Sequence, residues 1–351
     1  MGKMPTISAD HATRIADKLL QGAGAPENES KIVARHVISA NLAGHDSHGI
    51  IQIPTYIERV LKGDIVPGAK WEIIQESPTT TVVDGHWGFG YVANERAMQL
   101  TIEKAQRQNV QLRPFPTGAY RTFSNLPIDA AKEGMIALIT ADSGRGPKAV
   151  APFGGREKRL GTNPISIAMP SNLDGPFFID MASSAVAAGK INLALARGNN
   201  IPEGWIVDKE GRATTNPAAF KAGGPLLPLG GTEGYKGYGL SAMIEIFSGI
   251  LTGLGHGVEP TGRHNDGCFM AVFKVEAFRP LDVFKREVAE FAEYLKATQP
   301  AEGFDEVLYP GEIEHKQEVA RLRDGIQVED ATWEKLAALA KEYGVSSDLD
   351  M

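Results

Sequence analysis

The chain has 351 residues, enough to bury a large core and to form two domains. Its formal net charge of −7 gives no electrostatic case for nucleic acid or an anionic membrane, so we expect neither as a partner. One cysteine, Cys268, excludes an internal disulfide and lies in an apolar run typical of buried packing. The N-terminus lacks a signal-peptide pattern, and residues 240–251 are too short to span a bilayer, so we expect a cytoplasmic protein.

Helical patterns fill the N-terminal part of the chain. Ser8 can cap a first helix that ends at Gly22. An apolar stripe at helical spacing runs over residues 32–43, and Gly44 is a natural stop. After a short polar turn, residues 53–61 are expected to form a third helix.

Strand patterns follow this helical part. The expected strands are β-branched or buried apolar runs that end in turn residues. They lie at residues 79–85, 135–140, 164–169, 177–181 and 268–275. An amphipathic helix is expected around residues 93–105, and a glycine-rich loop at 231–239 leads into another helix at 240–251.

The tail returns to apolar stripes at helical spacing, so helices flank a mixed centre. We therefore expect the two termini to join in one helical domain, made of residues 1–75 and 280–351. Residues 76–279 are expected to form a central α/β domain. The chain as a whole is predicted to be a mixed α/β (α+β) protein.

A polar cluster, His45-Asp46-Ser47-His48, leaves the end of the second expected helix. Histidine titrates near neutrality, so it can pass a proton to a reacting atom. The cluster allows two interpretations: metal ligation by His45, Asp46 and His48, or a proton donor of the Ser47–His48 type. The spacing matches no helical His-x-x-x-His pattern and no third-site cluster is evident, so we favour the proton donor and expect no metal.

Nucleotide-binding motifs of the common kinds are absent from the sequence. No Gly-x-Gly-x-x-Gly opens a helix after a strand and there is no Walker-type loop, which disfavours the doubly wound dinucleotide fold. Two other places could hold an anionic cofactor. The loop after Asp180 offers amides and hydroxyls, and Lys236 with Gly237 lies where a helix begins.

With these pieces placed, the chain resembles the malate/L-lactate dehydrogenase family of the non-Rossmann type, nearly end to end. The stretches that carry the resemblance are residues 40–50, 150–155, 161–164, 236–238 and 308–312. The resemblance implies reversible, nicotinamide-dependent reduction of a 2-oxo acid to a 2-hydroxy acid, with NAD or NADP as cofactor. It also implies a helical domain paired with a cofactor- and substrate-binding α/β domain around a non-Rossmann sheet. A homodimer with sites near the subunit interface is expected.

The resemblance further implies roles for individual residues. His48 matches the proton donor, Ser47 would orient the substrate, and Thr162 and Asn163 would line the site. The positions that match cofactor-contacting segments are Thr122, Phe123, Ser124, Phe178, Ile179, Asp180, Met181, Ala182, Lys236, Gly311, Glu312, Ile313 and Glu314.

Two positions depart from the family pattern. Many relatives carry an arginine four residues after the proton-donor histidine, suited to a bidentate grip on a carboxylate. Gln52 stands there in this chain, so substrate-carboxylate binding must be weaker or come partly from elsewhere. The family also has a His-x-Gly segment that faces the nicotinamide, and Ala119 occupies the histidine position.

We hypothesise that residues from about 110 to 123 are a frame-shifted reading. Residues 112–118 carry two prolines where the family has a strand, and proline cannot donate to a strand ladder. Residues 119–122 can be encoded GCA-TAT-CGG-ACG, and one base later, with the next T, this reads CAT-ATC-GGA-CGT. That spells His-Ile-Gly-Arg, with histidine at the vacant position, and two compensating single-base changes suffice. The alternatives are chance through codon freedom and a genuine inactive variant.

Four functions therefore compete. A 2-hydroxyacid dehydrogenase leads. A reductase of cyclic imines such as pyrroline- or piperidine-2-carboxylate uses chemistry that occurs within the same family. A non-catalytic ligand-binding homologue is motivated by Ala119, and a metal-dependent hydrolase is a remote fourth.

Overall fold

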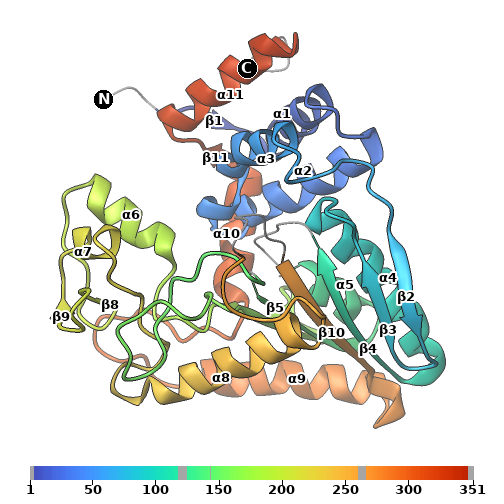
Figure 1. Ribbon diagram of the computed structural model, residues 1–351. Coiled ribbons are helices and arrows are strands. Elements are labelled where there is room, and N and C mark those ends of the chain that lie inside the picture. The colour runs from blue at the N-terminus through green and yellow to red at the C-terminus, as the bar shows by residue number, and fades with distance from the viewer. Residues whose placement is uncertain (1–3, 118–124, 143, 260–265, 347–351) are drawn as a thin grey trace.

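A computed structural model describes residues 4–117, 125–142, 144–259 and 266–346 of the chain (Figure 1). The predicted cofactor contacts at Thr122, Phe123 and Ser124 lie outside these residues, as does Ala119. No helix in the described ranges combines the length and the apolar composition that a bilayer span requires.

The N-terminal part forms the three predicted helices. Helix α1 (Ala9–Gly22) begins after Ser8, whose hydroxyl accepts a hydrogen bond from the His11 amide as an N-cap should. Helix α2 (Glu27–Leu42) begins five residues before the predicted start at residue 32. Its first turn is acidic, which suits a helix N-terminus but does not contribute to the apolar stripe on which the prediction was based. Helix α3 (Ile53–Leu61) has the predicted bounds.

Segments from the N-terminal and C-terminal parts of the described chain pair with each other. Strand β1 (Thr6–Ile7) pairs antiparallel with β11 (Ile326–Gln327), and α11 (Asp330–Glu342) packs on α3. Helix α10 (Glu312–Asp324) packs on α2 and descends from this helical layer toward the sheet (Figure 1). One hydrophobic core contains side chains from α1, β10 and the elements between them in the chain. Because this core is shared, it marks no boundary between two domains, and the predicted boundaries remain a prediction.

Within the described residues the main sheet has five strands in the order β4-β10-β5-β6-β7, and every neighbouring pair is antiparallel. The strands are β4 (Val110–Thr117), β10 (Asp266–Lys274), β5 (Met135–Asp142), β6 (Ile165–Met169) and β7 (Phe177–Met181). An antiparallel sheet has no βαβ crossovers, so this fold is not the doubly wound one, as the missing glycine motif indicated.

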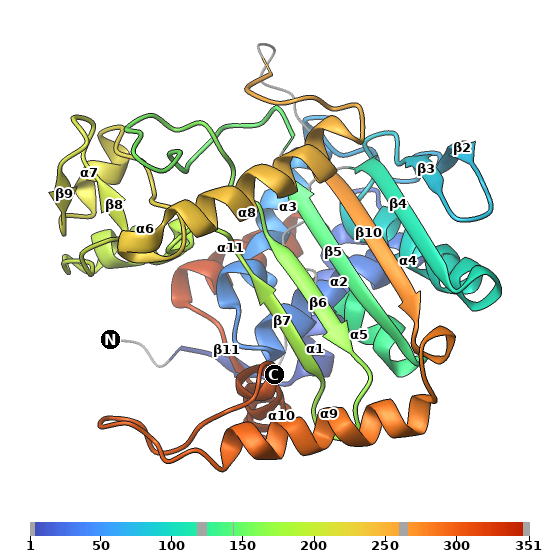
Figure 2. The same cartoon turned by 90° about the horizontal axis from the view of Figure 1, so that it is seen from below.

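Helices cover both faces of the sheet. On one face lie α4 (Gly90–Gln108) and α5 (Asn125–Lys132). On the other lies α8 (Tyr235–Glu245), which continues as a π-helical turn, Ile246–Ile250, while α9 (Leu281–Lys296) crosses near the opposite ends of the strands (Figure 2). Helix α8 begins inside the stretch predicted to be a glycine-rich loop, and Gly237 lets its first turn pack closely on Leu229.

Two smaller units flank the sheet. The hairpin of β2 (Glu72–Glu76) and β3 (Thr81–Asp84) lies beside β4. A lobe on the other side holds α6, α7 and the β8–β9 hairpin around its own apolar core (Figure 1). The elements of this lobe are α6 (Ala188–Ala196), β8 (Ile206–Val207), β9 (Ala213–Thr214) and α7 (Ala218–Lys221).

Strand β4 forms in spite of Pro114 and Pro116, which the sequence analysis judged poor for a strand. In the described part of the chain it pairs only with β10, so it is an edge strand of the main sheet. Strand β3 lies alongside it but belongs to a separate two-stranded sheet. Edge strands are where proline is tolerated, because one side of the strand needs no donors.

Candidate active site

The predicted proton-donor turn is a short 3₁₀ helix, Asp46–His48. The amide of His48 donates to the carbonyl of His45 over 2.9 Å, and the amide of Gly49 donates to the carbonyl of Asp46 over 3.1 Å. The side chains of the turn therefore start from a backbone that is hydrogen-bonded rather than from an open loop.

Ser47 and His48 are in direct contact. Ser47 Oγ lies 2.8 Å from His48 Nδ1, at hydrogen-bond distance. His48 is half-buried and Ser47 is exposed, so the pair sits at the surface of the turn. Gln52 donates from Nε2 to the backbone carbonyl of Ser47 over 2.7 Å, which braces the turn from its C-terminal side.

Asn41, at the end of α2, holds the turn from inside, and the sequence analysis did not identify it. Its Nδ2 donates to Asp46 Oδ1 over 2.7 Å, and its Oδ1 accepts the amide of Ile50 over 2.7 Å. A Cβ atom at Gly49 would lie 2.1 Å from Asn41 Oδ1, so only glycine fits there. Asn41 is 2% exposed in the fold, and its signal in the sequence was an amide side chain within an apolar helical stripe.

Two of the predicted cofactor segments meet at the start of α10. Gly311 has a left-handed φ of 96°, and a Cβ there would lie 2.5 Å from Phe178 Cδ1. The amide of Phe178 donates to the carbonyl of Pro310 over 3.1 Å. Glu314, one turn along α10, places Oε1 3.9 Å from Nε2 of His45, so the start of α10 adjoins the proton-donor turn, and it contacts the Phe178 segment at Gly311.

Glu312, also in the first turn of α10, accepts hydrogen bonds on both carboxylate oxygens from other groups of the fold. Burial would raise the pKa of this carboxyl group, but a hydrogen bond from Lys296 and the amide of Tyr309 outweigh burial and lower the pKa below its ordinary value. Glu312 is therefore a carboxylate whose charge is already compensated.

Thr162 lies in the segment that leads into β6, beside the loop after β7. Its carbonyl accepts hydrogen bonds from both the amide and the hydroxyl of Ser183, over 2.9 and 3.0 Å. Further along this loop, α6 begins against the proton-donor turn, since a Cβ at Gly189 would lie 3.5 Å from Ser47 Cβ. The segment after β7 thus connects Thr162 with Ser47.

Lys236 lies in the first turn of α8 and its side chain is 67% exposed. Its Nζ lies 3.7 Å from Glu233, a loose surface pair. The neighbouring Gly237 packs on Leu229, whose amide donates to the carbonyl of Ser183. The start of α8 therefore adjoins the loop after β7.

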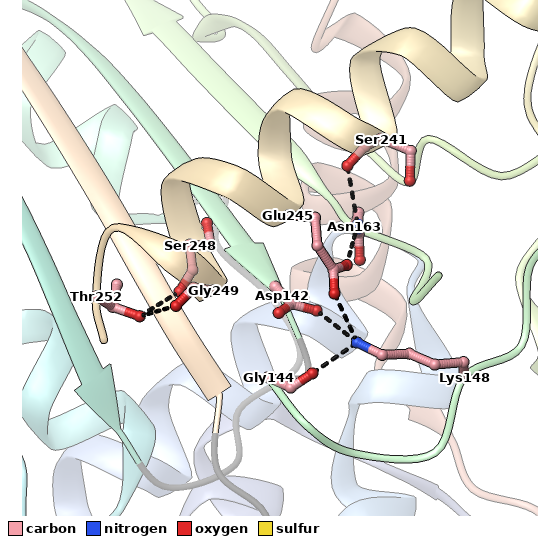
Figure 3. Close-up of polar contacts among 9 residues, drawn as sticks. All are labelled: Asp142, Gly144, Lys148, Asn163, Ser241, Glu245, Ser248, Gly249 and Thr252. Atoms are coloured by element: carbon pink, nitrogen blue, oxygen red, sulfur yellow. Dashed lines mark hydrogen bonds and ion pairs between the residues drawn. The ribbon is translucent and has the colours of Figure 1, made fainter. Parts of the chain in front are cut away.

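Asn163 lies deeper than the other predicted residues (Figure 3). It is 1% exposed, and its Nδ2 donates to the carbonyl of Ser241 over 3.0 Å and to Glu245 Oε2 over 2.9 Å. Both hydrogens of the amide are thereby used, which fixes the orientation of the side chain.

A buried ionic cluster continues from Glu245 (Figure 3). Lys148 Nζ donates to Glu245 Oε1 over 2.9 Å, to Asp142 Oδ1 over 3.2 Å and to the carbonyl of Gly144 over 2.6 Å. Burial raises the pKa of Asp142 to about 8; Lys148 opposes the rise and Glu245 adds to it. A single cation thus lies between two buried acids. The sequence analysis missed this cluster, whose signal was single charges in apolar surroundings.

Metal ligation was the rejected interpretation of the polar turn. Within residues 4–117, 125–142, 144–259 and 266–346, no group of three His, Cys, Asp or Glu side chains is arranged to hold a metal ion. In the turn itself, the carboxylate of Asp46 is held by Asn41 and by Arg321 of α10.

Known proteins share this architecture. Residues 7–337 match the family described as malate/L-lactate dehydrogenase. The L-sulfolactate dehydrogenase of Methanocaldococcus jannaschii is 37% identical over 97% of this chain and 98% of its own length. A crystal structure of malate dehydrogenase from Entamoeba histolytica superposes with a TM-score of 0.93 at 30% identity, covering 98% of this chain and 99% of that one. A Δ1-piperideine-2-carboxylate reductase from Pseudomonas syringae reaches a TM-score of 0.83 at 26% identity, covering 96% and 100%.

These matches define an oxidoreductase of the hydroxyacid-dehydrogenase class. The chain belongs to the malate/L-lactate dehydrogenase family, as its motifs indicated.

Proposed function

We propose that this protein reduces a 2-oxo acid to a 2-hydroxy acid, reversibly, with NAD or NADP, and that His48 is the proton donor. The observation that carries the proposal is the Ser47–His48 contact of 2.8 Å on a hydrogen-bonded turn. That turn adjoins the segment 311–314 through Glu314 and His45, and Gly311 of that segment packs against Phe178. A proton donor is useful only where hydride and proton can reach one carbonyl group together.

In this proposal Ser47 holds Nδ1 of His48, so Nε2 is the nitrogen that passes a proton. During reduction, negative charge develops on the substrate carbonyl oxygen, and a positioned imidazolium protonates that oxygen. In the oxidative direction the same nitrogen takes the proton from the hydroxyl group. Ser47, Gln52, Thr162 and Asn163 are the proposed substrate-binding residues.

The residues proposed to hold the cofactor suit an anionic dinucleotide. The first turn of α10 follows Gly311, which has no side chain to cap its amides, and Lys236 offers an exposed cation at the start of α8. Residues 122–124, 178–182 and 312–314 complete the proposed set. When bound, the nicotinamide supplies or accepts the hydride.

Gln52, a proposed substrate-binding residue, also braces the turn and lacks the bidentate grip that an arginine would have on a carboxylate. Its Nε2 donates to the carbonyl of Ser47, so one of its two N–H donors is already used inside the turn. The grip on the substrate carboxylate is therefore weaker or is shared with other residues. This favours testing substrates with different second groups, because malate, sulfolactate and piperideine-2-carboxylate occur in the names of the relatives.

A nicotinamide-absorbance screen tests the proposal. Purified protein is assayed with NADH and NADPH against a panel of 2-oxo acids and against pyrroline- and piperidine-2-carboxylate. Turnover of an oxo acid supports the dehydrogenase, and turnover of imines alone favours the imine reductase. Cofactor binding with no turnover on either panel favours the non-catalytic homologue that Ala119 motivates.

We also propose a homodimer. Helix α8 and its π-helical turn lie over one face of the sheet (Figure 2). Large apolar side chains along this helix and directly after it are exposed. They are Tyr235, Tyr238, Met243, Ile246, Phe247, Ile250 and Leu251. A contiguous exposed apolar stripe of this kind is typical of a protein interface.

A further inference from the structure

One face of α10 lies against the proton-donor turn. Glu314, Gln317 and Arg321 are spaced by three and four residues, which places them on the same side of a helix. Glu314 Oε1 lies 3.9 Å from His45 Nε2, and Gln317 Cγ lies 3.4 Å from where a Cβ at Gly44 would be. The helix therefore follows the turn for two of its own turns.

Arg321 makes the strongest contact of this face. Its Nη1 donates to Asp46 Oδ1 over 2.6 Å and its Nη2 donates to Oδ2 over 2.9 Å, a bidentate pair between residues 275 positions apart. Nη1 also donates to the backbone carbonyl of Asn41. Asp46 is about half exposed, so the ion pair adds little to global stability. Its bidentate geometry nevertheless fixes the orientation of the Asp46 carboxylate.

Asp46 is the first residue of the 3₁₀ turn that carries Ser47 and His48. Its carbonyl accepts the amide of Gly49, so a displacement of Asp46 displaces the turn. The other end of α10 begins at Gly311, packed against Phe178 in a proposed cofactor segment. A single rigid helix thus contacts both the proton-donor turn and the cofactor segment.

We propose that Arg321 is a positioning residue for His48. It acts through Asp46, and α10 holds the turn in register with the cofactor segment at its own first turn. The inference rests on the proposed function for the role of His48, but the contact itself is a property of this chain.

The kinetic test compares Arg321→Met and Arg321→Lys with Arg323→Met. Arg323 is the matched control, because it lies on the same helix, is exposed and pairs with its neighbour Asp324. A misplaced catalytic group of about 1 Å costs roughly a hundredfold in rate. Arg321→Met is expected to lower kcat by about ten- to a hundredfold while the Kd of the nicotinamide cofactor changes less than about twofold. Arg321→Lys should recover part of kcat, and Arg323→Met should match wild type.

A second readout needs no turnover. The amides of His48 and Gly49 are bonded within the turn, and the amide of Ile50 is bonded to Asn41. Hydrogen exchange of these three amides should accelerate in Arg321→Met while amides of α1 keep their wild-type rates. If Arg321→Met does not fold, Asp46→Asn removes the charge pair from the other side and is measured in the same way.

The two experiments distinguish a failure of the proposed function from a failure of the positioning role. A wild-type protein without turnover on any substrate sinks the proposed function, and the exchange experiment still decides the role of Arg321. Unchanged kcat with unchanged exchange in the turn overturns the positioning role. Uniformly faster exchange throughout the molecule, with kcat and cofactor binding lost together, also overturns it, because that is the signature of a structural residue.

Discussion

His48 can be tested as a single residue, since it is half-buried and its removal leaves no large cavity. His48→Ala is expected to lower kcat by about a hundred- to ten-thousandfold, the usual contribution of a general acid. The melting temperature and cofactor affinity should stay near wild type. Steady-state kinetics and a cofactor titration measure these quantities.

The neighbouring imidazole is the control for this experiment. His45 lies in the same turn but is directed toward Glu314, so His45→Ala should keep most of the turnover. If His48→Ala turned over at the wild-type rate, the proton-donor assignment would be wrong.

The identity of residue 119 can be tested by sequencing. Resequencing the gene is expected to reveal codons for His-Ile-Gly-Arg at positions 119–122, and a protein carrying those four residues should turn over substrate faster than the chain with Ala119. Confirmed codons for Ala-Tyr-Arg-Thr would contradict the frame shift. The non-catalytic homologue would then gain support.

Single residues were predictable where their chemistry is local. The Ser47–His48 contact joins adjacent residues, so a motif could suggest it. The sequence did not predict the roles of Asn41, Lys148 and Arg321. These roles depend on burial or on partners that are distant in the sequence, and a linear pattern shows neither.

At the scale of the elements, the proposed cofactor contact at the start of α8 can be tested through Lys236. Lys236→Ala is expected to weaken cofactor binding more than it lowers kcat, because an exposed cation at a helix start acts through electrostatic contact with an anion. Calorimetry measures the dissociation constant. Lys209→Ala is the control, since Lys209 is also 67% exposed and pairs with an acidic neighbour. Equal dissociation constants for Lys236→Ala and wild type would exclude Lys236 from the cofactor site.

The elements themselves were largely predictable from apolar periodicity. Helix α3 and strand β7 have the predicted bounds, since each presents a clear periodic or continuous apolar run between stop signals. The early starts of α2 and α8 were missed, because an acidic first turn and a glycine-rich first turn do not show an apolar stripe.

At the scale of the whole molecule, the buried cluster predicts a pH dependence of stability. The pKa of Asp142 is raised from 3.8 to about 8, so the folded protein keeps a proton that the unfolded chain releases between these values. Stability from this group is complete below about pH 4 and declines as the pH rises toward 8. Asp142→Asn removes this titration, so its melting temperature relative to wild type should rise between about pH 5 and pH 8. Asp129→Asn, at an exposed aspartate, should show no such trend.

The quaternary state is the other prediction at this scale. Light scattering is expected to give about twice the chain mass of 37.7 kDa. Ile250→Asp, in the exposed stripe of α8 and its π-helical turn, should shift the protein toward the monomer, because an interface loses affinity when a charge is buried without a partner. A wild-type mass of one chain, or an unshifted Ile250→Asp dimer, would contradict this interface.

Most helices and strands, the family and the polar turn could be read from the sequence, because periodicity and short motifs are properties of neighbouring residues. The antiparallel strand order, the pairing of β1 with β11, the Asp142–Lys148–Glu245 cluster and the contact of Arg321 with Asp46 became visible in the folded chain alone. These contacts join residues far apart in the chain. A local pattern shows that a face must be buried, but which partner buries it depends on how all the elements pack together.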